Sequence, residues 1–162
     1  MSKLRDSFWI LKMIHLCVLT GTSIFAIISL LITANSPVTI VNESTGKILQ
    51  VVAVVFSASS LFIGFGLFKK KIMAARASID PAEKRMERYR IACIIWWTMI
   101  EAPGLFAIAG YLFTSNLAFF FLAALHILIL LLFTPRKGNI ILLLNFNNEE
   151  VTHLERKEKF NS

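Results

Sequence analysis

Four long apolar segments dominate the sequence and restrict what the chain can fold into. They cover approximately residues 13–34, 48–68, 91–113 and 117–133. About twenty apolar residues in a helix cross a hydrocarbon core of roughly 30 Å, so the first three segments have full length and the fourth is short but sufficient. Their apolar residues come in blocks, without the period of an amphipathic helix or of a half-buried strand. The segments therefore predict transmembrane helices.

The overall composition also indicates a chain surrounded by lipid. The chain is 56% hydrophobic and has 14 Phe among its 162 residues, more apolar surface than a soluble domain of this size can bury. A segment surrounded by lipid must satisfy its own backbone hydrogen bonds, which an α-helix does. None of the segments alternates as the strands of a membrane barrel do. We therefore expect an all-α fold, an integral membrane four-helix bundle over residues 1–135.

The basic residues predict the orientation of this bundle. Of the 17 Lys and Arg residues, all but Lys47 lie before the first segment, between the second and third, or after the fourth. The positive-inside rule places these regions in the cytoplasm, together with both termini. The first segment is longer than a signal-peptide core, so we expect it to be retained. Topology and anionic lipid also account for the net charge of +7, so no nucleic acid partner is expected.

Residues 69–90 form the expected cytoplasmic loop. Within it, Asp80 is followed by Pro81 and then by Glu83, a pattern typical of a helix start with proline in the first turn. We therefore expect the third helix to begin in the cytosol near Pro81 and to enter the membrane near Ile91.

The cytoplasmic tail, residues 136–162, begins after Pro135, which ends the fourth helix. The apolar run NIILLLNF is too short to cross a membrane, so it either lies at the interface or packs under the bundle. Asn147 or Asn148 is expected to cap a short cytoplasmic helix, with Glu149 and Glu150 in its first turn.

Small residues mark the faces on which the helices are expected to pack. Membrane helix interfaces favour such residues because they let two backbones approach closely. Pro103 is expected to kink the third helix, since proline cannot donate a backbone hydrogen bond. The predicted packing positions are Ala26 and Ser29 in the first segment, Ser57 and Gly64 in the second, and Ala107 and Gly110 in the third.

Glu101 is the one charged residue between residues 94 and 113. An ionised carboxylate in hydrocarbon is costly, so such a group pairs, faces water or stays protonated. Helix geometry places Glu101 and His126 within about one turn of the same depth, which makes His126 the predicted partner. His15 is a further candidate for polar pairing. His15 and His126 are also the candidate axial ligands of a haem.

The stretch IEAPGLFAIAGYLF, residues 100–113, resembles the ion-carrying helix of the proteolipid, or c, subunits of rotary ATP synthases. The resemblance implies that Glu101 is an ion-binding carboxylate. The long cytoplasmic loop and the two flanking helices differ from a rotor-ring subunit. The whole layout, with TPRK after the fourth helix and an acidic tail helix, is similar to small uncharacterised four-helix bacterial inner-membrane proteins, which implies a location in that membrane.

Catalytic motifs are missing from the sequence. It has no metal-ligand spacing, phosphate-binding loop or nucleophile elbow, and Cys17 and Cys93 both lie in apolar segments. We therefore expect no enzyme, metal or cofactor, and predict a small accessory or structural subunit that works with a membrane-protein partner. The alternative is a proton- or cation-handling proteolipid, or a transporter-like homo-oligomer, that uses Glu101. A third alternative is a haem-binding electron-transfer protein.

Overall fold

The computed structural model describes residues 3–35 and 41–155. Almost all of these residues are helical, and no strand occurs among them, which confirms the predicted all-α class. The helices are α1 (Lys3–Asn35), α2 (Glu43–Ala77), α3 (Ala82–Thr114), α4 (Leu117–Leu132), α5 (Lys137–Leu144) and α6 (Asn148–Glu155).

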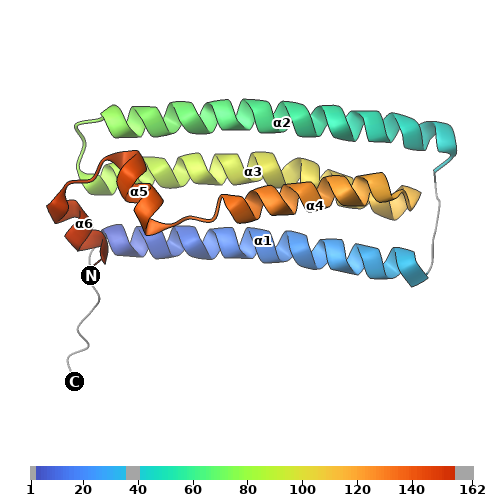
Figure 1. Ribbon diagram of the computed structural model, residues 1–162, viewed down its shortest axis with the longest axis horizontal. Coiled ribbons are helices and arrows are strands. Elements are labelled where there is room, and N and C mark those ends of the chain that lie inside the picture. The colour runs from blue at the N-terminus through green and yellow to red at the C-terminus, as the bar shows by residue number, and fades with distance from the viewer. Residues whose placement is uncertain (1–2, 36–40, 156–162) are drawn as a thin grey trace, which may run out of the picture.

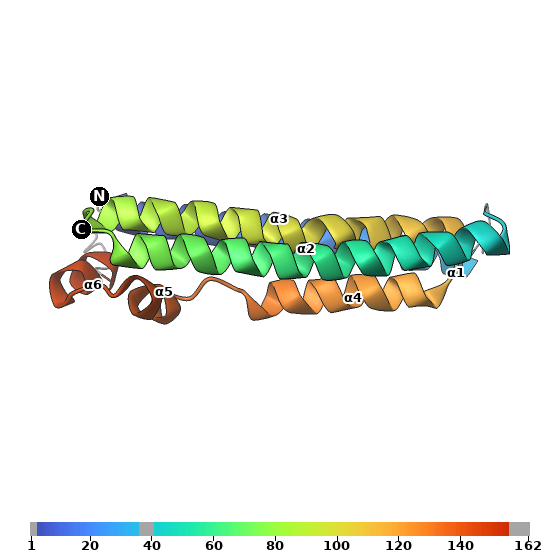
Figure 2. The same ribbon diagram turned by 90° about the horizontal axis from the view of Figure 1, so that it is seen from above.

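The helices α1, α3 and α2 lie side by side as a layer, with α3 in the middle (Figure 1). Figure 2 shows α4, α5 and α6 together on one face of this layer. Half of the most apolar stretch of α3 is buried, against 22% in α1 and in α2, so α3 is the central helix. The start of α1, the α2–α3 turn and α6 share one end of the bundle (Figure 1), called here the α5–α6 end.

Three of the helices, α1, α2 and α3, are long and apolar enough to cross a membrane. The fourth candidate span is α4 together with α5, two helices bent by 73° at a short break. By itself α4 has 16 residues, about 24 Å, which is less than a hydrocarbon core of about 30 Å. Large apolar side chains cover the outer faces, such as Phe62, which is 84% exposed. These features fit a membrane protein with three or four spans.

The helices extend well beyond the predicted apolar segments. The predicted loop of residues 69–90 is mostly helix, because α2 continues to Ala77 and α3 begins at Ala82. These extensions are rich in Lys, Arg, Ala and Glu, which favour helix without giving an apolar signal. The predicted start near Pro81 is confirmed, although Pro81 is the N-cap residue and precedes the first helical position.

Asp80 organises the turn between α2 and α3. Its carboxylate accepts a hydrogen bond from the Ser78 hydroxyl and forms ion pairs with Arg88 and Lys84. The Ser78 hydrogen bond, together with the two cations, holds the pKa of Asp80 below its usual value, although desolvation acts in the opposite direction. The turn is therefore stabilised by an ionised carboxylate.

Asparagine caps three of the helices. The side chain of Asn42 accepts from an amide of α2, and that of Asn116 from an amide of α4. At α6 the Asn147 side chain accepts from the Glu150 amide at 2.9 Å, and the Glu150 carboxylate accepts from the Asn147 amide at 2.8 Å. Of the two predicted caps, Asn147 and Asn148, the structure therefore has Asn147, in a reciprocal capping box.

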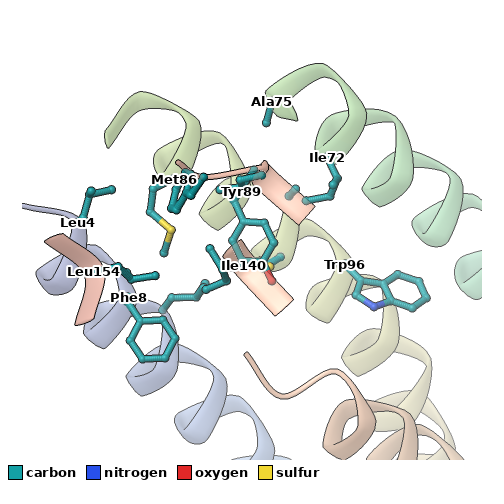
Figure 3. Close-up of a cluster of buried hydrophobic side chains, with 14 of the residues drawn as sticks. Leu4, Phe8, Ile72, Ala75, Met86, Tyr89, Trp96, Ile140 and Leu154 are labelled. Carbon is teal, nitrogen blue, oxygen red and sulfur yellow. The ribbon is translucent and has the colours of Figure 1, made fainter. Parts of the chain in front are cut away.

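The largest hydrophobic cluster lies at the α5–α6 end, where the tail folds back onto the bundle (Figure 3). Ile140, Leu144 and Leu154 of the tail are fully buried there, together with Phe8 of α1 and Met86 of α3. Of the two predicted placements of the run NIILLLNF, the structure therefore has the one under the bundle.

Arg85 of α3 fastens this tail. Its guanidinium donates to the Leu144 carbonyl at 2.8 Å, forms an ion pair with Glu150, and lies 5.1 Å from the centre of the Phe146 ring. One nearly buried side chain thus contacts the end of α5, the start of α6 and the residues between them.

Candidate functional site: buried polar pairs around Glu101

Glu101 lies where α3 meets α1, and its partner is a hydroxyl group of α1. The Thr22 Oγ1 and Glu101 Oε1 atoms are 3.3 Å apart. Thr22 is 1% exposed, whereas Glu101 is partly exposed and adjoins the exposed α3 positions Ala102 and Leu105. The carboxyl group is therefore at the edge of the buried interface.

The Thr22 hydroxyl group has two acceptors within hydrogen-bond distance. The Thr22 hydroxyl also lies 2.9 Å from the Val18 carbonyl, one turn earlier in α1. A hydroxyl carries one proton, and the carbonyl is the nearer acceptor. Thr22 therefore shares its proton between the Val18 carbonyl and the Glu101 carboxyl group, and it binds the carbonyl more closely.

His126 has partners of its own. Its Nδ1 lies 2.8 Å from the Leu122 carbonyl, and its Nε2 lies 3.0 Å from the Ser57 hydroxyl of α2. The carbonyl can only accept, so Nδ1 carries the proton and Nε2 accepts from Ser57. Both ring nitrogens of a neutral imidazole are then satisfied.

The predicted hydrogen bond between Glu101 and His126 does not occur within the described residues. The predicted depth holds, because a Cβ at Gly104, one turn from Glu101, would lie 3.1 Å from the His126 Cβ. The predicted direction differs: His126 bonds to α2 and Glu101 bonds to α1.

His15 lies near the end of α4. Its Nε2 is 3.2 Å from the Thr134 hydroxyl, which itself donates to the Leu131 carbonyl, so the imidazole is the donor. The Trp97 ring lies 4.7 Å from the imidazole, centre to centre. The other nitrogen, Nδ1, is buried and has no hydrogen-bond partner among the described residues. Because the Nε2 atoms of His15 and His126 both contact hydroxyl groups, a haem would have to displace these contacts.

The small residues selected from the sequence all lie in helix interfaces or the core. The structure buries each of Ala26, Ser29, Ser57, Gly64, Ala107 and Gly110. A Cβ at Gly64 would lie 2.6 Å from the Met99 Cβ, and a Cβ at Gly110 would lie 2.6 Å from the Phe119 ring. The glycines therefore permit the close contacts of α3 with α2 and with α4. Pro103, the expected kink, is buried within α3, which continues through it as one helix.

Three hydroxyl partners were not identified as such from the sequence. Thr22, Ser57 and Thr134 bond to the three predicted ionisable residues, and the first two occupy small-residue positions. The sequence signal that could have identified such partners is a hydroxyl residue on a helix face that is expected to be buried. Within residues 3–35 and 41–155, no group of three or more His, Cys, Asp and Glu side chains is arranged to hold a metal ion.

No protein-family model, curated protein or solved structure matches the chain.

Proposed function

We propose that the chain is a non-catalytic subunit of a larger complex in a bacterial inner membrane. In this proposal the chain crosses the membrane four times with both termini in the cytoplasm, and a membrane-protein partner docks beside Glu101. The basic asymmetry of the sequence supports the orientation, since Lys and Arg residues lie in the start of α1, in the end of α2, in the start of α3 and around the start of α5.

The partial exposure of Glu101 supports a partner. The α3 face opposite α4 is uncovered and includes the exposed residues Thr98, Ala102 and Leu105, which we call the open face. Glu101 borders this face and has a single hydrogen-bond partner, Thr22, among the described residues. A carboxyl group that is open to lipid is costly. A donor from a partner helix would lower that cost by about 0.6 kcal/mol, the mean for polar contacts in membranes.

Site-specific photocrosslinking in native membranes tests this proposal. A photoreactive residue at Ala102 should give a product with a different protein, and the same residue at the lipid-facing Phe62 should not. Glu101→Ala should reduce the yield at position 102 more than Glu101→Gln does, because glutamine keeps a hydrogen-bonding group of similar size. A product of twice the monomer mass would indicate a homo-oligomer. Crosslinking to lipid alone at both positions would refute the docking proposal.

Proton handling by Glu101 is the second candidate, and its contact with the buried Thr22 hydroxyl group supports it. A carboxyl group that is neutral at rest can release and regain a proton. The His15–Thr134 pair lies seven residues from Thr22 along α1, about 10 Å toward the α5–α6 end. The buried Trp97 ring packs against His15, so a proton path along this line would need the ring to move or water to enter.

Two variants separate a structural role of Glu101 from proton transfer. Thr22→Val keeps the shape and removes the hydroxyl group, so it should shift the infrared C=O stretch of protonated Glu101, whereas His126→Phe should leave that band unchanged. In proteoliposomes, a proton carrier should lose its flux on Glu101→Gln substitution and keep its stability. Normal flux in this variant would eliminate proton handling. A band that responds to His126 and not to Thr22 would contradict the observed pairing.

A further inference from the structure

One side of α5 is exposed and apolar, although the opposite side packs under the bundle. Ile140 and Leu144 are fully buried, whereas Leu142, on the other side of the helix, is 74% exposed. Leu132 at the end of α4 is 73% exposed and lines the same cavity of about 570 Å³ as Leu142. Phe65 of α2 lines this cavity as well, so the exposed side of α5 continues into the apolar sides of α2 and α4.

The orientation of α5 fits the surface of a membrane. Its axis runs across the long helices (Figure 1) and is bent by 73° from that of α4, so if α4 crosses the bilayer, α5 lies close to the membrane plane. With 8 residues it is about 12 Å long and cannot cross the hydrocarbon core. Arg136 directly precedes α5 and Lys137 begins it. Helices with an apolar side and basic residues beside it are typical of the membrane interface.

Trp9 and Lys12 of α1 indicate the depth of the interface at this end of the bundle. Trp9 is 55% exposed, and the Lys12 ammonium group lies 5.7 Å from the centre of its ring. Tryptophan is enriched at membrane–water interfaces, and a lysine near the end of a span turns its charge toward the headgroups. The neighbouring residue, Phe8, contacts α5, because its ring lies 5.7 Å from the Lys137 ammonium group and it shares a buried cluster with Ile140. The level of α5 is therefore the level that Trp9 marks.

We propose that α5 is an interfacial anchor, which lies among the lipid headgroups of the leaflet at the α5–α6 end and inserts Leu142 between acyl chains. The proposal rests on the membrane position of the bundle proposed above. Lipid is the occupant that the surroundings favour, because the molecules that cover Phe65 and Leu132 reach Leu142 along a continuous apolar surface. A partner protein at this place would have to replace that lipid. The anchor holds the docked tail at a constant distance from the bilayer.

Spin-label accessibility in the full chain tests the proposal, in nanodiscs of phosphatidylethanolamine and phosphatidylglycerol. The background is the double variant Cys17→Ala and Cys93→Ala, which removes both thiols. One label is then attached at Leu142→Cys, Phe62→Cys or Thr152→Cys. Phe62 is 84% exposed on α2, and Thr152 is exposed on α6. The labels at 142 and 62 should be more accessible to oxygen than to a water-soluble nickel chelate, and the label at 152 should show the reverse order.

A label at position 142 that behaves like the one at 152 would overturn the anchor. If the label at 62 is in lipid, that result refutes the anchor alone, whereas a label at 62 that also favours the nickel chelate refutes the membrane position of the bundle as well. The native side chain provides a second measurement, without a label that could itself prefer lipid. In the methyl-labelled chain, Leu142 should show nuclear Overhauser contacts with acyl chains, and Leu144, buried on the opposite side of α5, should not. Contacts of Leu142 with water alone would overturn the proposal.

Discussion

The close contact of α2 with α3 at Gly64 makes a quantitative prediction. An alanine Cβ at this position would lie 2.6 Å from the Met99 Cβ, about 1 Å inside the favourable distance of two carbon atoms. The Met99 Cβ is attached to the backbone of α3 and cannot rotate away, so the two helices must separate. Overpacking of this kind costs about 1–3 kcal/mol.

Gly66 provides the matched control for this substitution. It lies two residues further along α2, and a Cβ there would meet no atom within 4 Å. Both changes gain about 0.5–1 kcal/mol of helix propensity. Gly66→Ala should therefore be neutral or stabilising, and Gly64→Ala should be less stable than Gly66→Ala by the overpacking cost of about 1–3 kcal/mol.

Reversible unfolding in mixed micelles of mild detergent and sodium dodecyl sulfate measures this difference. The midpoint of Gly64→Ala should fall at a lower mole fraction of dodecyl sulfate than that of Gly66→Ala. Coincident midpoints, or a more stable Gly64→Ala, would refute the inference that Gly64 is needed for close approach to α3.

Three further predictions concern the topology and the α5–α6 end. Reporter fusions should be active in the cytoplasm after Ser78 and outside it after Ser115; a cytoplasmic signal at Ser115 would exclude the fourth span. Arg85→Ala should weaken the docking of α5 and α6 by about 2 kcal/mol, since it leaves a partly buried carboxylate unpaired, and should speed their amide exchange, whereas Arg90→Ala should not. Because the pKa of Asp80 is lowered on folding, its contribution to the α2–α3 turn should be complete at neutral pH and be lost as the pH falls through the folded value. Amide exchange at the turn should show this loss, and Asp80→Asn should abolish the pH dependence.

The positions of the long helices follow from the sequence because lipid-facing helices need uninterrupted apolar runs. The ends of these helices do not follow from the apolar runs. Residues 69–77, for example, continue α2 although four of them are charged. The placement of α5 was open for a similar reason. Its apolar run is equally suited to an interface and to a core, and only the presence of Phe8 and Met86 beneath it decides between them.

The hydrogen-bond partner of Glu101 cannot be predicted from helix periodicity alone. The short connection after Thr114 makes α3 and α4 neighbours, and depth along the membrane then favoured His126. To predict the pairing, one must also know how each helix is rotated about its axis and which helix, besides α2 and α4, contacts α3. In the structure that neighbour is α1, which supplies Thr22 from 79 residues earlier in the chain.

The contacts of Arg85 with α5 and α6 have a consequence for biosynthesis. Leu144 and Glu150 leave the ribosome after α1, α2, α3 and α4, so the guanidinium of Arg85 has neither partner while these four helices emerge. During that interval Phe8 and Met86 lack their cover from α5 and α6. An interrupted chain therefore presents apolar side chains and the unpaired guanidinium of Arg85 to chaperones and proteases, whereas a finished chain covers both in one docking step.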